Sequence, residues 1–578
     1  MRLTNLILTA GVPIAQSAVA DLYSVGGGQQ FLGGGHHVPS TKFTCDLPPV
    51  LNPSADGLPA ARDLFGDEDA LMKQVNRHST LVKIPSVSYD DNGEPGKDPR
   101  WNVFYELHAA LAYLYPNVHL RMGRDVVNTF GLVFSIKGTN PALQPLMLTA
   151  HQDVVPVADE STWKYPPFSA HFDGRWLWGR GASDDKNSLT ALMSALDMLL
   201  SNPAWVPKRS IIVALGFDEE CSGRRGAGEI GKFLEEQWGK HSMAVILDEG
   251  GMGLDLLEGK TLYALPAVME KGHVDIWLDL KINGGHSSTP FPHTGIGIMS
   301  EIVVKLESKP YSPQLIKDSP IHHHLVCQAR YSPKASPNVT KLIEKGDLDT
   351  LAEELATIDR KTQYRLQTSQ SVDYFIGGVK INAMPEKIRI GINHRVAPQN
   401  SIPEVKGRIL DLIKPIVKHY GLGVSAFRGE DNNPDGLDNF GPAYDVDYNG
   451  TLTLSSSQPS KVAPISPSSG DIWDVLSGTI QHSFAFDNGK VVPVGELMTG
   501  NTDTRHYLRK FSPVATRSVM LIPNYTQTCQ SMSIAGLRRV RGGTQNAHTV
   551  DEAIDMQAHM EALRFYYDLV RNFDAAEV

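Results

Sequence analysis

Runs of apolar residues alternate with segments of helical periodicity between residues 131 and 250. The apolar runs, which have the character of strands buried on both faces of a sheet, occupy 131–136, 146–150, 211–217 and 243–247. Between them, 187–202 repeats leucine at three- and four-residue steps, and 227–237 is the next helical segment. This order predicts an α/β domain with a parallel or mixed sheet covered on both faces. Ligands of such sheets bind beyond the carboxyl ends of the strands.

A different pattern begins near residue 270. Apolar and polar residues alternate over 273–282, which predicts a strand with one buried face. The predicted elements that follow are a helix over 294–308, strands over 372–382 and 386–396, a helix interrupted at Pro415, and a strand over 422–428. The order β-α-β-β-α-β matches the α+β ferredoxin-like unit, so we expect a second domain inserted into the first. The segment 309–370 is predicted to add one more helix, over 349–359.

These elements divide the 578 residues into two domains, the first of which is split by the second. The expected boundaries are 66–268 and 430–578 for the first domain and 269–429 for the inserted domain. The loop-rich stretch 430–470 is predicted to carry a short strand back to the first domain, and a long helix over 551–573 follows. Residues 21–65 are rich in Gly, Pro and His and are expected to form an N-terminal arm.

The first twenty residues have the features of a secretory signal. Arg2 precedes an apolar stretch over 6–15, and the small residues that follow favour cleavage near Ala20. We therefore expect residues 1–20 to be a signal peptide, with an uncleaved signal anchor as the alternative. The apolar core is too short for a stable membrane span, and no other segment has the ~18 uninterrupted apolar residues of a transmembrane helix.

Composition and charge narrow the class of protein. Acidic residues outnumber Lys and Arg by 64 to 54, for a net charge of −10. This balance argues against nucleic-acid binding, because proteins that neutralise phosphates usually carry a basic stripe. Sequons at Asn338, Asn449 and Asn524 fit the secretory route and predict a glycoprotein. Four cysteines could form two disulfides in an oxidising compartment, with three pairings open.

Histidines and carboxylates gather where the strands of the first domain end. They are His151 and Asp153 after the second run, Asp184 and Asp185 before the first helix, Asp218, Glu219 and Glu220 after the third run, Asp248 and Glu249 after the fourth, and His548 before the last helix. Imidazole and carboxylate without cysteine are ligands of borderline or hard divalent ions, so we expect Zn²⁺, with Co²⁺ or Mn²⁺ as substitutes. The charges of Asp184, Glu220 and Asp248 with a bridging hydroxide offset two Zn²⁺, which favours two ions.

Sequence motifs of other kinds of site are either absent or lie in the wrong structural context. The stretch Gly226–Gly231 matches GxGxxG, but the charged residues 218–225 separate it from the preceding strand, so a nucleotide site is not expected. Neither HExxH nor GxSxG occurs, which disfavours a single-zinc helix protease and an ordinary serine hydrolase. The run 322–324 of three histidines lies in the inserted domain, away from the other motifs, and is expected to be solvated.

Six strings resemble the motifs of a known family, in the family's order. They are LMLTAHQDVVPV, LWGRGASDDKNSL, FDEECSGRRGA, ILDEGG, GGHSSTP and AHTVDE. Over about residues 70–575 the sequence resembles the co-catalytic dizinc exopeptidases and aminoacylases. It is most similar to the carboxypeptidase S branch, which contains the Gly-X carboxypeptidases of fungal vacuoles and relatives that hydrolyse N-acyl amino acids. The resemblance implies a dizinc exopeptidase-like catalytic domain with a mixed central sheet, and an inserted lid or dimerisation domain.

The resemblance also implies a role for each motif residue at the metal site. His151 and Asp248 would bind one zinc, Glu220 and His548 the other, and Asp184 would bridge them, with Glu249 left open as the alternative to Asp248. Asp153 would fix the tautomer of the His151 ring, and Glu219 would be the general base. Because adjacent residues of an extended chain point in opposite directions, Glu220 could bind metal while Glu219 faces water. A cis peptide bond between Asp184 and Asp185 is implied as well.

A second group of implied roles concerns the substrate. His286, on the inserted domain, would stabilise the oxyanion of the transition state. Arg395 and Arg505 are candidates to bind a terminal carboxylate, which suits the planar guanidinium, and Asn382 would assist. In dimeric relatives the equivalent of His286 reaches into the partner's site, whereas the enlarged inserted domain makes a monomer plausible. Monomer and homodimer therefore both stay open.

We expect a metallocarboxypeptidase that hydrolyses the C-terminal amide bond of short Gly-X peptides with a dizinc-bridged hydroxide. It would act in a vacuole lumen or outside the cell; the alternative is the vacuolar membrane, through the uncleaved anchor. The alternative activity, hydrolysis or synthesis of N-acyl amino acids, would use the same metals on a different amide. A metal-free interaction protein on the same fold is disfavoured, because none of the residues expected at the metal site is missing.

Overall fold

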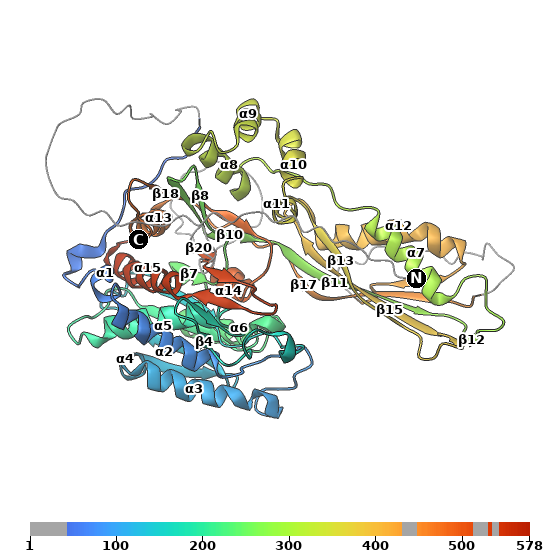
Figure 1. The fold of residues 1–578 in the computed structure, drawn as a ribbon, viewed down its shortest axis with the longest axis horizontal. Helices are drawn as coiled ribbons and strands as arrows, with labels where there is room; N and C mark the ends of the chain where they lie inside the picture. The colour runs from blue at the N-terminus through green and yellow to red at the C-terminus, as the bar shows by residue number, and fades with distance from the viewer. Residues whose placement is uncertain (1–42, 430–447, 512–529, 534–542) are drawn as a thin grey trace, which may run out of the picture. The chain divides into compact units, whose positions relative to one another are not determined.

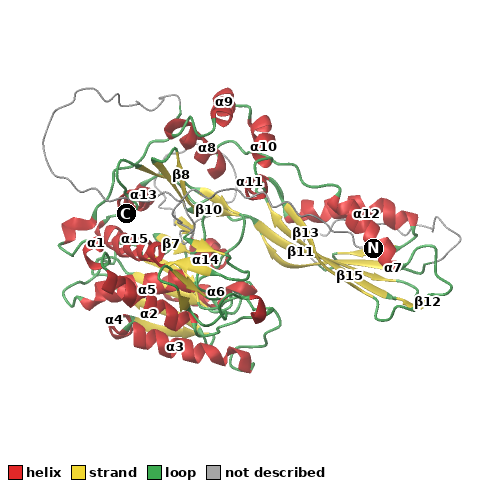
Figure 2. Ribbon diagram, viewed as in Figure 1, coloured by secondary structure: helices red, strands yellow, loops and turns green. Residues whose placement is uncertain are grey.

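The computed structural model describes residues 43–429, 448–511, 530–533 and 543–578. The predicted signal peptide over 1–20, the first half of the predicted arm, Asn524 and Cys529 lie outside these residues. Within them, two larger sheets with their helices account for most of the fold (Figures 1 and 2).

The larger sheet has the strand order β1-β2-β6-β3-β7-β20-β10-β19. Its strands are β1 (Gly123–Val127), β2 (Gly131–Ile136), β3 (Leu146–His151), β6 (Ile211–Gly216), β7 (Val245–Asp248), β10 (Ala267–Glu270), β19 (Glu496–Met498) and β20 (Gln530–Ser533). β3, β6 and β7 run parallel, whereas β1 is antiparallel to β2 and β2 to β6. The predicted mixed sheet is therefore confirmed.

Helices cover both faces of this sheet. Alternate residues of β6 point to opposite sides, as strand geometry requires. Ile211, Val213 and Leu215 share a core with α5 (Lys186–Ser201) and α15 (Met556–Ala575). Ile212 and Ala214 share another core with α6 (Ala227–Trp238) and α14 (Thr504–Phe511). The first core is completed by α1 (Ala61–Leu64), α2 (Glu68–Val82), α3 (Val103–Leu114), α4 (Pro116–Arg121) and α13 (Asp471–Ser483).

Two small sheets extend this part of the fold. One contains β8 (Gly253–Leu257), β9 (Thr261–Leu265) and β18 (Lys490–Pro493), and the other β4 (His171–Phe172), β5 (Trp176–Trp178), β21 (Thr544–Gln545) and β22 (Ala553–Asp555). The second sheet joins the chain ahead of α5 to the chain ahead of α15. The peptide bond between Asp184 and Asp185, just before α5, is cis, as the resemblance implied.

The inserted domain is built on a sheet of order β13-β15-β11-β17-β16. Its strands are β11 (Gly272–Lys281), β13 (Ser369–Gly377), β15 (Lys387–Val396), β16 (Gly423–Ala426) and β17 (Thr451–Ser460), and β12 (Gly285–His286) pairs separately with β14 (Ala383–Met384). The predicted alternation is present: Val274, Ile276 and Leu278 are buried against α7 (Gly295–Glu307) and α12 (Ile402–His419). α12 continues through Pro415 and is not interrupted there.

The strand expected to return from 430–470 to the first domain instead belongs to the inserted sheet. β17 pairs antiparallel with β11 over 451–460 and parallel with β16. It thereby occupies the place beside β11 that the last strand of a ferredoxin-like unit would take, and displaces β16 to the edge. The exact domain boundaries stay a prediction.

The segment 309–370 contains four helices where one was expected. They are α8 (Pro320–Tyr331), α9 (Pro337–Lys345), α10 (Leu348–Ala356) and α11 (Arg360–Leu366). Their core includes Met269 of β10 and Leu497 of β19, so these helices pack against the larger sheet. A disulfide joins Cys45 to Cys327 on α8, and Cys221 is a free thiol.

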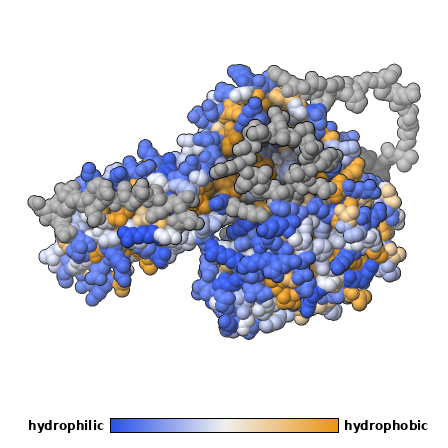
Figure 3. All heavy atoms as spheres, turned by 180° about the vertical axis from the view of Figure 1, so that it is seen from behind, coloured by the Kyte–Doolittle hydropathy of each residue, from blue (hydrophilic) through white to orange (hydrophobic). Residues whose placement is uncertain are grey.

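Residues 43–65, expected to be part of a loose arm, are packed into the fold. Asp56, for example, forms a 2.6 Å ion pair with the buried Arg571 of α15. On the face of the molecule in Figure 3, hydrophilic residues cover most of the surface, with hydrophobic residues in smaller groups. In the described parts of the chain, no helix combines the length and the apolar character that crossing a membrane requires.

Candidate metal centre and active site

The loops at one edge of the larger sheet carry the histidines and carboxylates found in the sequence. His151 ends β3, Asp184 precedes α5, Glu219 and Glu220 follow β6, Glu249 follows β7, and His548 lies between β21 and β22. Because β3, β6 and β7 are parallel, their carboxyl ends meet at this edge. His548 reaches this cluster from a loop that lies 397 positions after His151 in the sequence (548 − 151).

The carboxylate of Asp184 lies between two histidines. Its Oδ1 is 3.2 Å from Nε2 of His151, and its Oδ2 is 3.2 Å from Nε2 of His548. Each histidine also meets one glutamate: His151 Nε2 is 3.3 Å from Glu249 Oε1, and His548 Nε2 is 3.2 Å from Glu220 Oε2. Two ligand atoms that are each ~2.0–2.1 Å from a tetrahedral zinc are separated by about 3.3 Å. The spacing therefore fits two ions that share Asp184.

Burial shifts the pKa values of this cluster. It raises the pKa of Glu220, and it raises the pKa of Glu249 by a larger amount. The pKa of His548 is raised to about 11 by its hydrogen bonds to Asp184 and Glu220. Burial opposes ionisation of Asp184 too, but its hydrogen bonds to the two histidines lower its pKa. Oε1 of Glu220 and Oδ2 of Asp248 are buried without a hydrogen-bond partner among the described residues. Crowded buried carboxylates with unused oxygens fit divalent cations, which offset their charge.

Asp153 lies behind the His151 ring, on the side away from the cluster. Nδ1 of His151 is 3.3 Å from Oδ1 of Asp153 and 3.1 Å from its backbone oxygen. The Asp153 carboxylate also accepts hydrogen bonds from Ser88 Oγ at 2.6 Å and from the backbone N–H groups of Glu219 and Glu220, both at 3.1 Å. It therefore orients the ring and the two glutamates together. No sequence pattern distinguishes Ser88 from other loop serines, which is why it was missed.

The two adjacent glutamates lie in a 3₁₀ turn, not in the extended chain that was expected. The turn spans Glu219–Cys221. The carboxylate of Asp218 stabilises it by accepting hydrogen bonds from the backbone N–H groups of Arg225 and Gly226 at 2.9 and 2.7 Å. The physical reason given for the divergence of Glu219 and Glu220 was therefore wrong, although their carboxylates still have different partners.

Glu219 faces an arginine where Glu220 faces a histidine. Its Oε1 accepts a hydrogen bond from Nη2 of Arg505 at 3.3 Å. Burial raises the pKa of Glu219 to about 8, against the opposing charge of Arg505. A carboxylate with this proton affinity can take a proton from water near neutral pH and give it up again.

Asp248 contacts a threonine on the neighbouring strand rather than a histidine. Its Oδ1 accepts hydrogen bonds from Thr149 Oγ1 at 2.6 Å and from the backbone N–H of Glu249 at 2.9 Å. Thr149 belongs to β3, which pairs with β7, so this bond fixes Asp248 between the strands. Glu249, the alternative that the sequence left open, is the carboxylate that meets His151.

Two predicted substrate residues lie far from this cluster within the same chain. His286 in β12 and Asn382 next to β14 are both exposed. β11 begins one residue after Lys271, whose carbonyl accepts a hydrogen bond from Asn501 at 2.6 Å, close to the arginines. The ten residues of β11 span about 33 Å at ~3.3 Å per residue. His286 therefore lies at the other end of this strand, where Figure 1 labels β12.

The two arginines predicted to bind a carboxylate lie near each other. Arg395 on β15 donates a hydrogen bond to Oδ1 of Asn501 at 3.2 Å. Arg505 lies four positions after Asn501 in the sequence, in the first turn of α14. Burial and the charge of Arg505 both lower the pKa of Arg395, so an anion between them would relieve their repulsion. A cavity of about 930 Å³ lies beside Arg505, and its apolar walls include Val396, Ile402, Val462 and Leu508.

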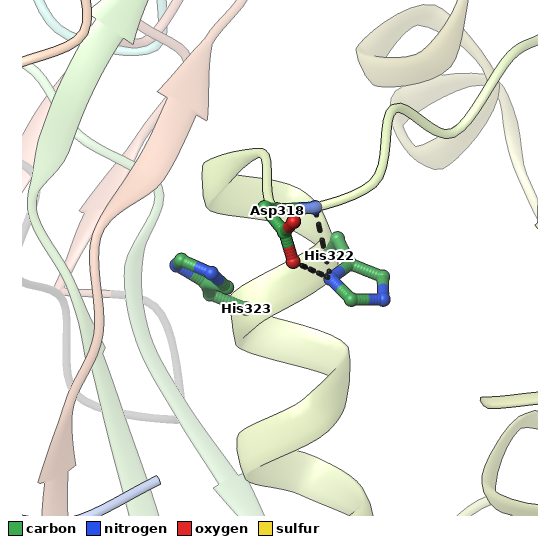
Figure 4. A group of neighbouring side chains, drawn as sticks. All are labelled: Asp318, His322 and His323. Carbon is green, nitrogen blue, oxygen red and sulfur yellow. Dashed lines mark hydrogen bonds and ion pairs between the residues drawn. The ribbon is translucent and has the colours of Figure 1, made fainter. Parts of the chain in front are cut away.

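Two histidines of the run 322–324 form a looser, more exposed group with Asp318, in which the possible ligand atoms of Asp318, His322 and His323 all lie within 4.8 Å of one another. His322 Nδ1 accepts the backbone N–H of Asp318 at 3.2 Å and lies 3.9 Å from its Oδ1. That separation exceeds the ~3.3 Å between two ligands of one tetrahedral zinc. His323 extends to the opposite side of the helix (Figure 4), and the rings of His322 and His323 are 6.2 Å apart. The expectation that the run is solvated is wrong for His324, which is buried with its Nδ1 2.8 Å from Oε1 of Glu496.

A histidine–carboxylate cluster on the loops of an α/β sheet, with a proton acceptor and paired arginines beside it, defines a metal-dependent hydrolase. The model of peptidase family M20/M25/M40 matches residues 147–572. The chain belongs to this family and is a metal-dependent peptide hydrolase.

Relatives of known sequence and structure agree with this assignment. Carboxypeptidase S of Saccharomyces cerevisiae is 36% identical over 515 residues, which cover 86% of this chain and 84% of that protein. The N-fatty-acyl-amino acid synthase/hydrolase PM20D1 of Homo sapiens is 30% identical over 526 residues, 88% of this chain and 89% of that protein. The solved M20 family metallo-carboxypeptidase Sso-CP2 from Sulfolobus solfataricus has the same fold, with a TM-score of 0.56 at 15% identity, and the match covers 88% of this chain and all of that one, 100%.

Proposed function

We propose that the protein is a dizinc carboxypeptidase that releases the C-terminal residue of short peptides of the Gly-X type. The observation that carries the proposal is the carboxylate of Asp184, 3.2 Å from a histidine on each side. We assign His151, Glu249 and Asp184 to one ion and His548, Glu220 and Asp184 to the other, with Glu249 in the place first given to Asp248. The likeness to carboxypeptidase S supports the choice of a C-terminal substrate.

The residues of the chain divide the reaction between them. When bound, the two zinc ions would polarise the scissile carbonyl and lower the pKa of a water towards ~7. Glu219 takes the proton of the attacking water and returns it to the leaving amine, for which its pKa of about 8 is suited. Asp153 holds the His151 ring in one tautomer while the charge of the site changes.

Recognition of the substrate falls to the paired arginines. Arg395 and Arg505 would bind the terminal carboxylate, and the cavity of about 930 Å³ beside Arg505 would receive the attached side chain. The lining of this cavity is mixed, with apolar residues such as Val396 and Leu508 beside the basic residues Arg224, Lys406 and Lys461, so it has room for a bulky side chain without selecting an apolar one.

We further propose that His286 and Asn382 act on a second copy of the chain. Within one chain, the length of β11 keeps His286 from the cluster. β13 is an edge strand of the inserted sheet and exposes Tyr374, Phe375 and Ile376. An exposed apolar edge strand of this kind is suited to pairing with a symmetry mate.

For localisation we propose the secretory pathway, ending in a vacuole lumen or outside the cell. The sequon residues Asn338 and Asn449 are both exposed, which supports glycosylation there. Digestion of the purified protein with an endoglycosidase should lower its mass; an unchanged mass would contradict N-glycosylation at these sequons.

The likeness to PM20D1 favours one further candidate, hydrolysis or synthesis of N-fatty-acyl amino acids. A parallel assay of an N-blocked Gly-Leu dipeptide and a long-chain N-acyl-leucine separates the two activities. We expect turnover of the dipeptide, its loss on chelation, and its recovery with about two Zn²⁺ per chain. Turnover of the acyl amide alone would overturn the carboxypeptidase proposal. Glu219→Gln should lower kcat on the true substrate by about 10²–10⁴-fold with unchanged zinc content.

A further inference from the structure

Two residues in the site motifs have no role in the proposed reaction, and they contact each other. Arg180 precedes Asp184 in the second motif, and Glu552 follows His548 in the last. Nη1 of Arg180 is 2.6 Å from Oε2 of Glu552, across 372 residues of sequence. Their side chains are only 4% and 1% exposed.

The second oxygen of Glu552 holds the backbone that carries Asp184. Oε1 accepts hydrogen bonds from the backbone N–H groups of Ser183 at 2.9 Å and Asp184 at 3.1 Å, and from Ser183 Oγ at 3.1 Å. The carbonyl of Glu552 accepts the N–H of Gly179 at 2.9 Å, beside the pairing of β22 with β5. Both ends of the 179–184 loop are therefore tied to one glutamate.

Glu552 also ends the loop that carries His548. The φ angles of Asn546, His548 and Asp551 are 59°, 63° and 60°, in the left-handed region that non-glycine residues adopt at a cost. A loop with three such residues needs fixed ends. The residue that fixes one end of it, Glu552, is the residue that fixes the Asp184 loop.

A contribution to stability alone does not explain a buried charge pair at this position. Apolar residues of similar volume replace buried ion pairs with little or no loss of stability. They cannot accept the N–H groups of Ser183 and Asp184, which would then be left without a partner. The carboxylate of Glu552 accepts these N–H groups, and Arg180 balances its charge.

We propose that Glu552, with its charge balanced by Arg180, is a positioning residue that aligns Asp184 and His548 on the same metal ion. The pair sets the distance between the 179–184 loop, which carries Asp184, and the loop between β21 and β22, which carries His548. The inference rests on the proposed two-metal function, but concerns the geometry of one ion: the ion bound by His548, Glu220 and Asp184.

The test is chelator competition on the full-length enzyme, which resolves the affinities of the two ions. Glu552→Met, which cannot accept the N–H groups of Ser183 and Asp184, should weaken the ion bound by His548, Glu220 and Asp184 by about 10–100-fold, as loss of a residue behind a metal ligand does. The other ion, which shares only Asp184 with it, should be weakened less. Arg175→Gln is the control, because it removes a neighbouring ion pair, that between Arg175 and Asp555 of β22, which are 2.8 Å apart. It should leave both affinities unchanged.

Wild-type affinities for both ions in a folded Glu552→Met variant would overturn the inference, whatever its melting temperature. If that variant does not fold, Arg180→Lys replaces it, since a lysine retains the charge but not the fork geometry. Weaker binding of one ion would support the inference, and a lower melting temperature with both affinities intact would overturn it. A wild-type protein that binds fewer than two ions would instead contradict the proposed function.

Discussion

The adjacent residues Asp248 and Glu249 have different surroundings, and a pair of substitutions separates their roles. Asp248→Asn retains an Oδ1 that can accept the hydrogen bonds of Thr149 and of the Glu249 N–H, so we expect two ions per chain and activity within about threefold of wild type. Glu249→Gln should bind about one ion and lose activity by about 10²-fold or more. Metal analysis with steady-state kinetics measures both, and loss of an ion from the Asp248 variant would return that residue to the ligand set.

His78 makes stability depend on pH. Its ring is buried, Nε2 donates to the carbonyl of Ala182 at 2.9 Å, and burial lowers its pKa to about 4. Because the unfolded chain binds a proton below pH ~6.5 and the folded chain does not, stability is complete above pH ~6.5 and is lost towards pH 4, by up to roughly 1.4 kcal/mol per pH unit.

The expected consequence is a smaller acid effect in His78→Gln. The melting temperature of the chelated wild type should fall more between pH 7 and pH 5 than that of the variant. An equal fall in both proteins would show that His78 does not titrate in this range.

The residues of the site were predictable by type and position, but not their local geometry. His151, Asp184 and His548 follow from strand ends and motif order. The turn at Glu219 depends on Asp218 accepting hydrogen bonds from residues seven and eight positions later. The contact of Asp248 depends on Thr149, 99 residues earlier. Sequence periodicity contains no information on either contact.

At the scale of elements, strands buried on both faces were predicted nearly to the residue, as β2 and β6 show. The four helices within 309–370 were not, because α9, α10 and α11 have only nine, nine and seven residues. Helices this short are marginal on their own and form by packing, here around Leu351 and against Met269 and Leu497. β17 was misplaced for a related reason, since nothing in an isolated strand indicates which sheet it joins.

The disulfide of α8 gives an element-scale prediction. It closes a span of 282 residues and ties α8 to the first described residues. Cys45→Ser and Cys327→Ser should each lower stability by roughly 3–5 kcal/mol, and the double variant should be no worse than either. Differential scanning calorimetry measures this, and additive losses would contradict the bond.

At the scale of the whole molecule, the position of His286 predicts activity shared between two chains. His286→Ala and Glu219→Gln should each be inactive alone. Mixed in equal amounts with exchange of subunits, half the dimers are heterodimers with one intact site of two, so about a quarter of wild-type activity should return. An inactive mixture, together with a monomer by sedimentation, would place His286 outside catalysis or require it to act within one chain.

The separation of 397 positions between His151 and His548 also determines when, during synthesis, both histidines are present in the chain. At about 5–20 residues per second, a ribosome adds the last ligand roughly 20–80 s after the first. A growing chain, or one clipped before His548, has the pocket and its base but an incomplete set of metal ligands. On the proposed ligand assignment, we therefore expect hydrolysis to begin only once His548 has been added and has reached the other ligands.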